Sequence, residues 1–106
     1  MVELNARTGS SLARLGRDAE AHVRLGRAVE GFEERLRMGA DDPFTRYYAA
    51  IALELRGRRD RAMESLEAAA RLRPAFTVRR AEREPDFTAL RRDPRFSQIA
   101  SGGDPA

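Results

Sequence analysis

The chain has 106 residues, of which 42% are hydrophobic and 35% are charged, and its formal net charge is +3. This length favours a single domain, and this composition excludes an intrinsically disordered chain. No apolar run approaches the ~20 residues that a membrane-spanning helix needs. The absence of cysteine excludes disulfides and thiolate chemistry.

The N-terminal segment carries the weakest pattern. Its first residues, MVELNARTGSS, lack the hydrophobic core of a signal peptide, so we expect a cytoplasmic location. Leu12 and Leu15 suggest a short helix, which Gly9 and Gly16 flank.

A long amphipathic helix is predicted over residues 17–38. Its apolar residues recur at helical spacing and form one stripe. They are Ala21, Leu25, Ala28, Val29, Phe32 and Leu36. Gly39 follows as a C-terminal stop. Gly26 and Gly31 lie inside this helix, where each costs roughly 1 kcal/mol relative to alanine. They indicate either a break near Gly26 or a close contact with another helix.

Two further helices follow in the middle of the chain. The first begins at Asp42, whose side chain can cap it, and Pro43, which suits the first helical position, and it ends near residue 56. It is apolar nearly all round, so it must pack between a helix before it and one after it. A turn at residues 57–60 leads to another helix over residues 60–73.

The C-terminal part is predicted to contain short amphipathic pieces. A helix that starts near Phe76 must end at Pro85, because proline lacks an N–H and clashes with the preceding turn. A short helix over residues 86–92 is expected next, and Asp93 with Pro94 repeats the pattern of a cap followed by proline. These pieces suit the end of a helical stack, and residues 101–106 are expected to form a flexible tail.

The segment 43–74 reads PFTRYYAAIALELRGRRDRAMESLEAAARLRP and resembles one tetratricopeptide repeat (TPR), a helical hairpin with a period of ~34 residues. The resemblance rests on Ala50, Gly57, Ala62, Ala69 and Pro74. ERLRMGADDP resembles the closing helix of a preceding repeat, and REPDFTALRRDPRF resembles an ending found on many bacterial TPR proteins. The resemblance covers roughly residues 25–100, and the first 24 residues depart from the repeat spacing.

The resemblance implies an all-α fold, a short right-handed superhelical stack of antiparallel helical hairpins. Residues 1–100 would form one domain, with residues 76–100 as its capping helices. The implied function is that of a non-catalytic protein-binding scaffold, as in the C-terminal modules of bacterial signalling proteins. The groove that binds a peptide, a helix or a second subunit would be lined by Phe44, Tyr47, Ile51, Glu54 and Leu55.

Too few neighbours exist within the chain to cover every side of the helix 43–56. We therefore expect the side with Tyr47 and Ile51 to stay partly open, and an exposed apolar patch of this kind marks an interaction surface. A second copy of the chain is the simplest partner, so we expect weak to moderate self-association, as a homodimer, through the groove or the N-terminal helix. The alternative is that Tyr47, Tyr48 and Ile51 belong to the ordinary core.

A second function would use the arginines, which account for all 20 basic residues. Guanidinium groups suit phosphate and carboxylate recognition, although a GC-rich coding sequence also explains this usage. The turn carries four of them, Arg56, Arg58, Arg59 and Arg61. They form either a contact for acidic partners or nucleic acid, or a solvated loop. No module that combines aromatic and basic residues is present, which disfavours nucleic acid.

No motif points to catalysis or to a cofactor. His22 is the only histidine, so no zinc site can be assembled from histidine and cysteine. Asp41 and Asp42 precede a proline and suit a helix N-terminus better than a metal. Neither a glycine-rich phosphate loop nor a serine-nucleophile motif appears. We therefore expect no enzymatic activity, no metal and no membrane partner.

Overall fold

The computed structural model describes residues 1–101, and every regular element in this range is helical. The α-helices are α1 (Val2–Arg14), α2 (Asp18–Arg37), α3 (Pro43–Leu55), α4 (Arg59–Leu72), α5 (Pro74–Arg83) and α6 (Pro94–Ala100). Two 3-10 turns, η1 (Pro85–Phe87) and η2 (Leu90–Arg92), lie between α5 and α6. The predicted all-α class is confirmed for these residues. Apart from Ser101, the expected flexible tail lies outside the described residues.

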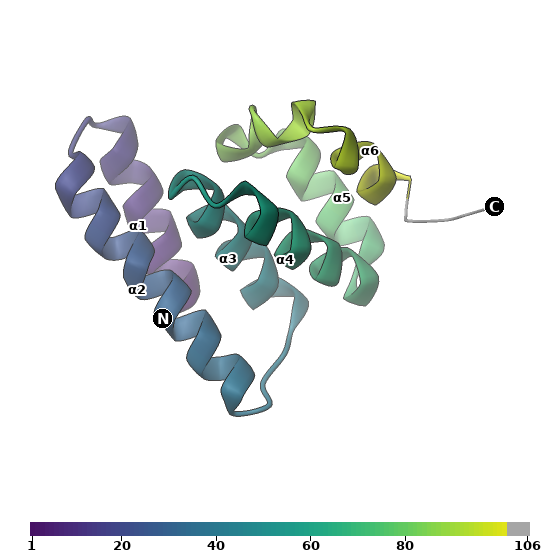
Figure 1. Cartoon of the computed structure of the whole chain (residues 1–106), viewed down its shortest axis with the longest axis horizontal. Coiled ribbons are helices and arrows are strands. Elements are labelled where there is room, and N and C mark those ends of the chain that lie inside the picture. Colours follow the sequence, from purple (N-terminus) through teal and green to yellow (C-terminus); the bar gives the residue numbers. More distant parts are fainter. Residues whose placement is uncertain (102–106) are drawn as a thin grey trace.

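The helices follow one another along the long axis of the molecule (Figure 1). The pair α1 and α2 lies at one end, α3 and α4 lie in the middle, and α5 to α6 close the other end. Helix α3 packs against α1, α2 and α4, and it also contacts η1. The principal extents are 44 × 32 × 20 Å, so the molecule is elongated and flat.

The N-terminal segment forms more structure than the sequence indicated. Helix α1 runs from Val2 to Arg14 and packs against α2, whereas the prediction was a short helix around Leu12 and Leu15. Gly9 does not flank this helix but lies inside it. A Cβ atom at residue 9 would lie 2.6 Å from the Cγ atom of Leu25, so a larger residue would push α1 and α2 apart. A residue without a side chain lets the two helices approach this closely.

The α1–α2 and α3–α4 hairpins resemble each other in sequence and in their turns. Each turn contains a glycine with φ +76°, Gly16 in the first and Gly57 in the second. Equivalent residues stand 41 positions apart, as from residue 16 to residue 57. These pairs are Gly9 and Ala50, Gly16 and Gly57, Ala21 and Ala62, Leu25 and Leu66, and Ala28 and Ala69. The second helices differ in length, since α2 has 20 residues and α4 has 14.

The three central helices lie where the periodicity placed them. Helix α2 is continuous through Gly26 and Gly31, so the interpretation as a break is wrong. A Cβ atom at residue 26 would lie 2.4 Å from Nη1 of Arg56, so the close contact is with a side chain from the α3–α4 turn.

The predicted helix over 86–92 is wrong. Two 3-10 turns replace it, and Thr88 Oγ1 donates to the carbonyl oxygen of Pro85.

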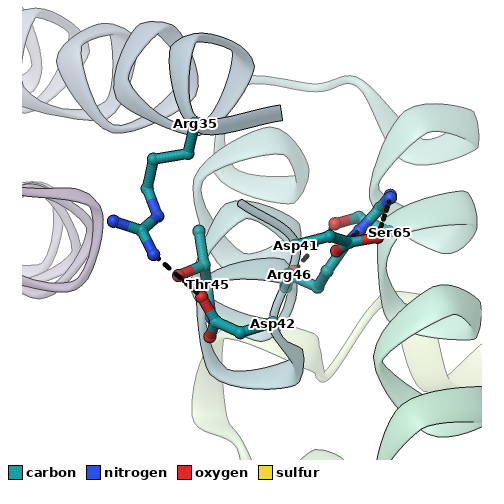
Figure 2. A network of polar contacts seen from close by, with 6 residues as sticks. All are labelled: Arg35, Asp41, Asp42, Thr45, Arg46 and Ser65. Atoms are coloured by element: carbon teal, nitrogen blue, oxygen red, sulfur yellow. Dashed lines mark hydrogen bonds and ion pairs between the residues drawn. The ribbon is translucent and has the colours of Figure 1, made fainter. Parts of the chain in front are cut away.

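The junction between α2 and α3 is held by short polar contacts (Figure 2). Asp42 caps α3 as predicted, since its Oδ1 accepts from Thr45 N at 2.8 Å and its Oδ2 accepts from Thr45 Oγ1 at 2.7 Å. Arg35 of α2 donates to the same carboxylate at 3.1 Å. Asp41 accepts two hydrogen bonds from Arg46, at 2.7 and 3.0 Å. Ser65 of α4 donates to the Arg46 carbonyl, which ties the junction to the second hairpin.

Helix α3 forms the centre of the core. Every residue from Tyr47 to Leu53 is buried, and these residues face all sides of the helix. Apolar side chains from α1, α2, α4, α5, η1, η2 and α6 complete the same core. The prediction that this helix packs between neighbours is therefore confirmed.

Substitution of Ala62 by leucine should destabilise the second hairpin. Ala62 has no exposed surface and belongs to the core, so a larger side chain must displace its neighbours. We expect a loss of about 1–3 kcal/mol in the free energy of unfolding, measured by urea denaturation. The control, Ala75→Leu, changes an exposed residue of α5 and should alter stability by less than about 0.5 kcal/mol. Equal midpoints for the two variants would contradict the packing described here.

Stability should fall in acid partly through Asp42. Burial opposes ionisation, but the hydrogen bonds from Thr45 and Arg35 outweigh it and hold the pKa of Asp42 below its ordinary value. A lowered pKa in the folded state stabilises the fold above the unfolded pKa of about 4, and this contribution is lost as the pH falls through the folded value. Asp42→Asn keeps the cap to Thr45 N without a titrating group. Thermal melts from pH 7 to pH 2 should therefore show a smaller acid loss for Asp42→Asn than for the wild type.

Candidate functional site

The groove predicted on α3 is not open. Tyr47 is 0% exposed and Ile51 is 4% exposed, so both side chains belong to the core and do not form an exposed apolar patch. The Tyr47 ring packs edge-to-face against Phe87 of η1, with 5.6 Å between the ring centroids. The expectation of an exposed apolar patch at Tyr47 and Ile51 is wrong, because α1 and the segment after α4 cover α3. Self-association was expected from this exposed patch, so the structure removes the reason for that expectation.

The other three predicted groove residues contact different parts of the molecule. Phe44 is 44% exposed and packs edge-to-face on Phe76, with 4.9 Å between the centroids. Glu54 accepts two hydrogen bonds from Arg59, at 2.7 and 2.8 Å. Leu55 is partly buried and packs against the core. The five residues therefore do not line one surface.

A different concave site lies between α1 and η1, over α3. We call it the α1–η1 cleft. Its volume is about 120 Å³, and polar and charged side chains form most of its lining. The lining residues are Ala6, Arg7, Ser10, Ser11, Arg14, Tyr48, Ile51, Glu84 and Asp86. Only Ile51 was a predicted groove residue, so the sequence interpretation found the right helix but not the right lining.

The hydroxyl group of Tyr48 lies between two guanidinium groups. It accepts a hydrogen bond from Arg7 of α1 and another from Arg80 of α5, the latter at 3.4 Å. The Arg7 guanidinium also lies 4.9 Å from the centre of the Tyr48 ring, within cation–π range. Hydrogen bonding to Glu3 is the main cause of a raised pKa at Arg7, and hydrogen bonding to Tyr48 is the main cause of a raised pKa at Arg80.

The opposite wall of the α1–η1 cleft carries carboxylates. Asp86 of η1 accepts from Ser10 Oγ at 2.7 Å and from Arg14 Nη2 at 3.3 Å. Glu84 accepts from the Tyr47 hydroxyl at 2.8 Å. Burial, followed by this hydrogen bond to Glu84, raises the pKa of Tyr47 strongly, so Tyr47 remains a donor. The cleft thus presents guanidinium donors on the α1 side and carboxylate acceptors on the η1 side.

The four arginines of the α3–α4 turn separate into two groups. Arg56, Arg58 and Arg61 line a second concavity of about 180 Å³, together with Gly26, Val29, Glu30 and Leu53. Arg59 does not join them, because Glu54 holds its guanidinium. His22 Nε2 lies 3.3 Å from Arg56 Nη2, which places the single histidine beside this group.

The remaining candidates have structural contacts. Asp41 is bound by Arg46, and Asp42 is bound by Thr45 and Arg35. Within residues 1–101, no group of three or more His, Asp or Glu side chains could hold a metal ion. None of the helices described in this range is both long and apolar enough to cross a membrane.

Comparisons with known proteins give no further indication of identity. No protein-family model matches the chain, and neither a curated protein nor a solved structure matches it.

The two adjacent tyrosines should differ sharply in their effect on stability. Tyr47→Phe removes the only hydrogen bond that links the buried α3 hydroxyl to Glu84, and a hydrogen bond to a charged group contributes about 1.5–3 kcal/mol. Tyr48→Phe removes an acceptor from two arginines that remain accessible to water, so its cost should be smaller. Urea denaturation at pH 7 should rank wild type, Tyr48→Phe and Tyr47→Phe in decreasing stability. The reverse order of the two variants would contradict this assignment.

Proposed function

We propose that this protein is a non-catalytic interaction module that binds an acidic segment of a partner protein in the α1–η1 cleft. The observation that carries the proposal is the Tyr48 hydroxyl held between Arg7 and Arg80, with Tyr48 and Arg7 both lining the concave site. Side chains from α1, α3 and η1 meet there, although these elements are far apart in the sequence.

A TPR-like arrangement is part of this proposal. The repeated hairpin supports it, because both copies place small residues at equivalent positions and turn at a glycine with positive φ. Helices α1 and α3 open the two hairpins, and α5 opens the segment that follows. In a right-handed superhelical stack, the first helices of successive hairpins line the inner surface, and the α1–η1 cleft lies on α1 and α3.

The chemistry of the cleft favours a carboxylate-bearing segment. The side chains of Arg7 and Arg14 are each 55% exposed, so their donors are accessible. Arg7 pairs with Glu3, which is itself exposed, and it also donates to the Tyr48 hydroxyl. Arg14 pairs at 3.3 Å with Asp86, whose side chain is only 9% exposed. An exposed ion pair contributes little to stability, so a partner carboxylate can replace Glu3 at Arg7 at low cost. The acceptors of Glu84 and Asp86 would then face donor groups of the bound segment.

Charge reversal tests the proposed site. The double variant Arg7→Glu and Arg14→Glu should bind a captured partner at least ten times more weakly, because it replaces attraction by repulsion at both donors. The matched control is Arg27→Glu with Arg71→Glu, which makes the same charge change at exposed positions of α2 and α4. Affinity purification with mass spectrometry would identify partners of the wild type, and titration would then compare the three proteins.

Both double variants should retain the helical circular dichroism of the wild type. The proposal requires that the control binds as the wild type does. A partner set and affinities that are equal for all three proteins would overturn it.

A further inference from the structure

We propose that the concavity between α2 and the α3–α4 turn, here called the turn pocket, binds a phosphoryl group. The turn pocket shares no lining residue with the α1–η1 cleft, so this site is independent of the proposed function. Its volume is about 180 Å³. Three guanidinium groups line it, a glycine of α2 lies against one of them, and few carboxylates neutralise them.

The three guanidinium groups come from one short stretch of chain. Arg56 is the C-terminal cap residue of α3, Arg58 precedes α4, and Arg61 lies in the first turn of α4. All three line the turn pocket. Guanidinium groups present several planar N–H donors, and a phosphoryl group offers three strong acceptor oxygens and close to two negative charges. Three guanidinium groups that line one pocket therefore suit a phosphoryl group better than a single carboxylate.

Gly26 allows Arg56 to lie across α2. A Cβ atom at this position would be 2.4 Å from Arg56 Nη1, so the end of the Arg56 side chain would have to move away from α2. Glycine in the middle of an exposed helix is less favourable than alanine. The helix therefore loses some intrinsic stability at the position where it leaves room for the Arg56 guanidinium beside the pocket.

Few carboxylates neutralise these arginines. Among the described residues, Arg58 forms no ion pair and Arg56 contacts His22 instead of an acid. Arg61 pairs with Glu33 at 3.0 Å, but both side chains are more than 40% exposed, so the pair is weak. Glu30 is the carboxylate in the lining. Helix α4 begins beside these arginines without a side-chain cap, so its positive end adds to the potential.

His22 provides a reporter for the turn pocket. It is the only histidine in the chain, so its ring protons give signals that no other residue produces. Its Nε2 atom lies 3.3 Å from Arg56 Nη2. An anion that takes the donors of Arg56 changes the surroundings of this ring directly.

The test is a titration of the full chain with inorganic phosphate, followed by proton NMR of the His22 ring at fixed pH and ionic strength. We expect a shift that saturates with phosphate and that an equal ionic strength of chloride does not produce. A parallel titration with a phosphoserine peptide identifies the source of the group. Tighter binding of the peptide assigns the site to a protein-borne phosphoryl group, and equal binding assigns it to the free ion. No saturating shift with either probe would overturn the proposal.

Two variants and a control separate the turn pocket from general charge. Arg58→Gln should weaken phosphate binding about tenfold, since it removes a charged donor from an exposed position without a partner among the described residues. Gly26→Ala should also weaken binding, because its Cβ displaces Arg56, although alanine favours the helix. The control Arg71→Gln removes the same charge from the last turn of α4 and should bind as the wild type does. An equal loss in Arg58→Gln and Arg71→Gln would overturn the site, whereas the Arg7 and Arg14 variants should leave it unchanged.

Discussion

The fold depends on one constraint, which is that the middle of helix α3 has no side that water can face. Its seven consecutive buried residues, from Tyr47 to Leu53, point in every direction around the helix axis. Burying one large apolar side chain contributes about 1.5–3 kcal/mol, so leaving any side open would be expensive. Helix α1 covers one side, α2 and α4 cover others, and η1 contributes Phe87. The hairpin before α3 and the irregular segment after α4 are thus both required by the composition of this single helix.

Sequence periodicity predicted the central helices because caps and breakers agree with it. Asp42, Pro43 and Gly57 mark ends that the structure keeps. The prediction from periodicity failed at α1, because Gly9 was interpreted as the end of a helix, whereas it is the point at which α1 contacts Leu25 of α2. A comparison of the chain with itself at a separation of 41 residues would have found this hairpin, since Gly9 then aligns with Ala50. The prediction of an open groove was wrong for another reason. An apolar pattern shows which sides of a helix must be buried, but not which distant segment of the chain covers them.

The arginine-rich turn shows the same limit for charges. The acid that holds Arg59 is Glu54, only five residues earlier, whereas the acid facing Arg61 is Glu33 of another helix. Local sequence treats Arg56, Arg58, Arg59 and Arg61 as one cluster. The fold separates Arg59 from the rest and adds His22 and Gly26 from α2, because helix packing and not chain proximity decides which charges meet.

The contact between Ser10 and Asp86 has a consequence for how the molecule unfolds. Stacked hairpins normally contact only their neighbours, so they behave as a one-dimensional array that can open from either end. Here a hydrogen bond of 2.7 Å joins α1 to η1 across 76 positions of sequence, and Arg14 reinforces it. This link joins the first helix to the segment between α5 and α6, so that loosening α1 removes a partner from η1. Opening of α1 and opening of η1 should therefore be correlated, and a ligand that displaces Asp86 would loosen both elements together.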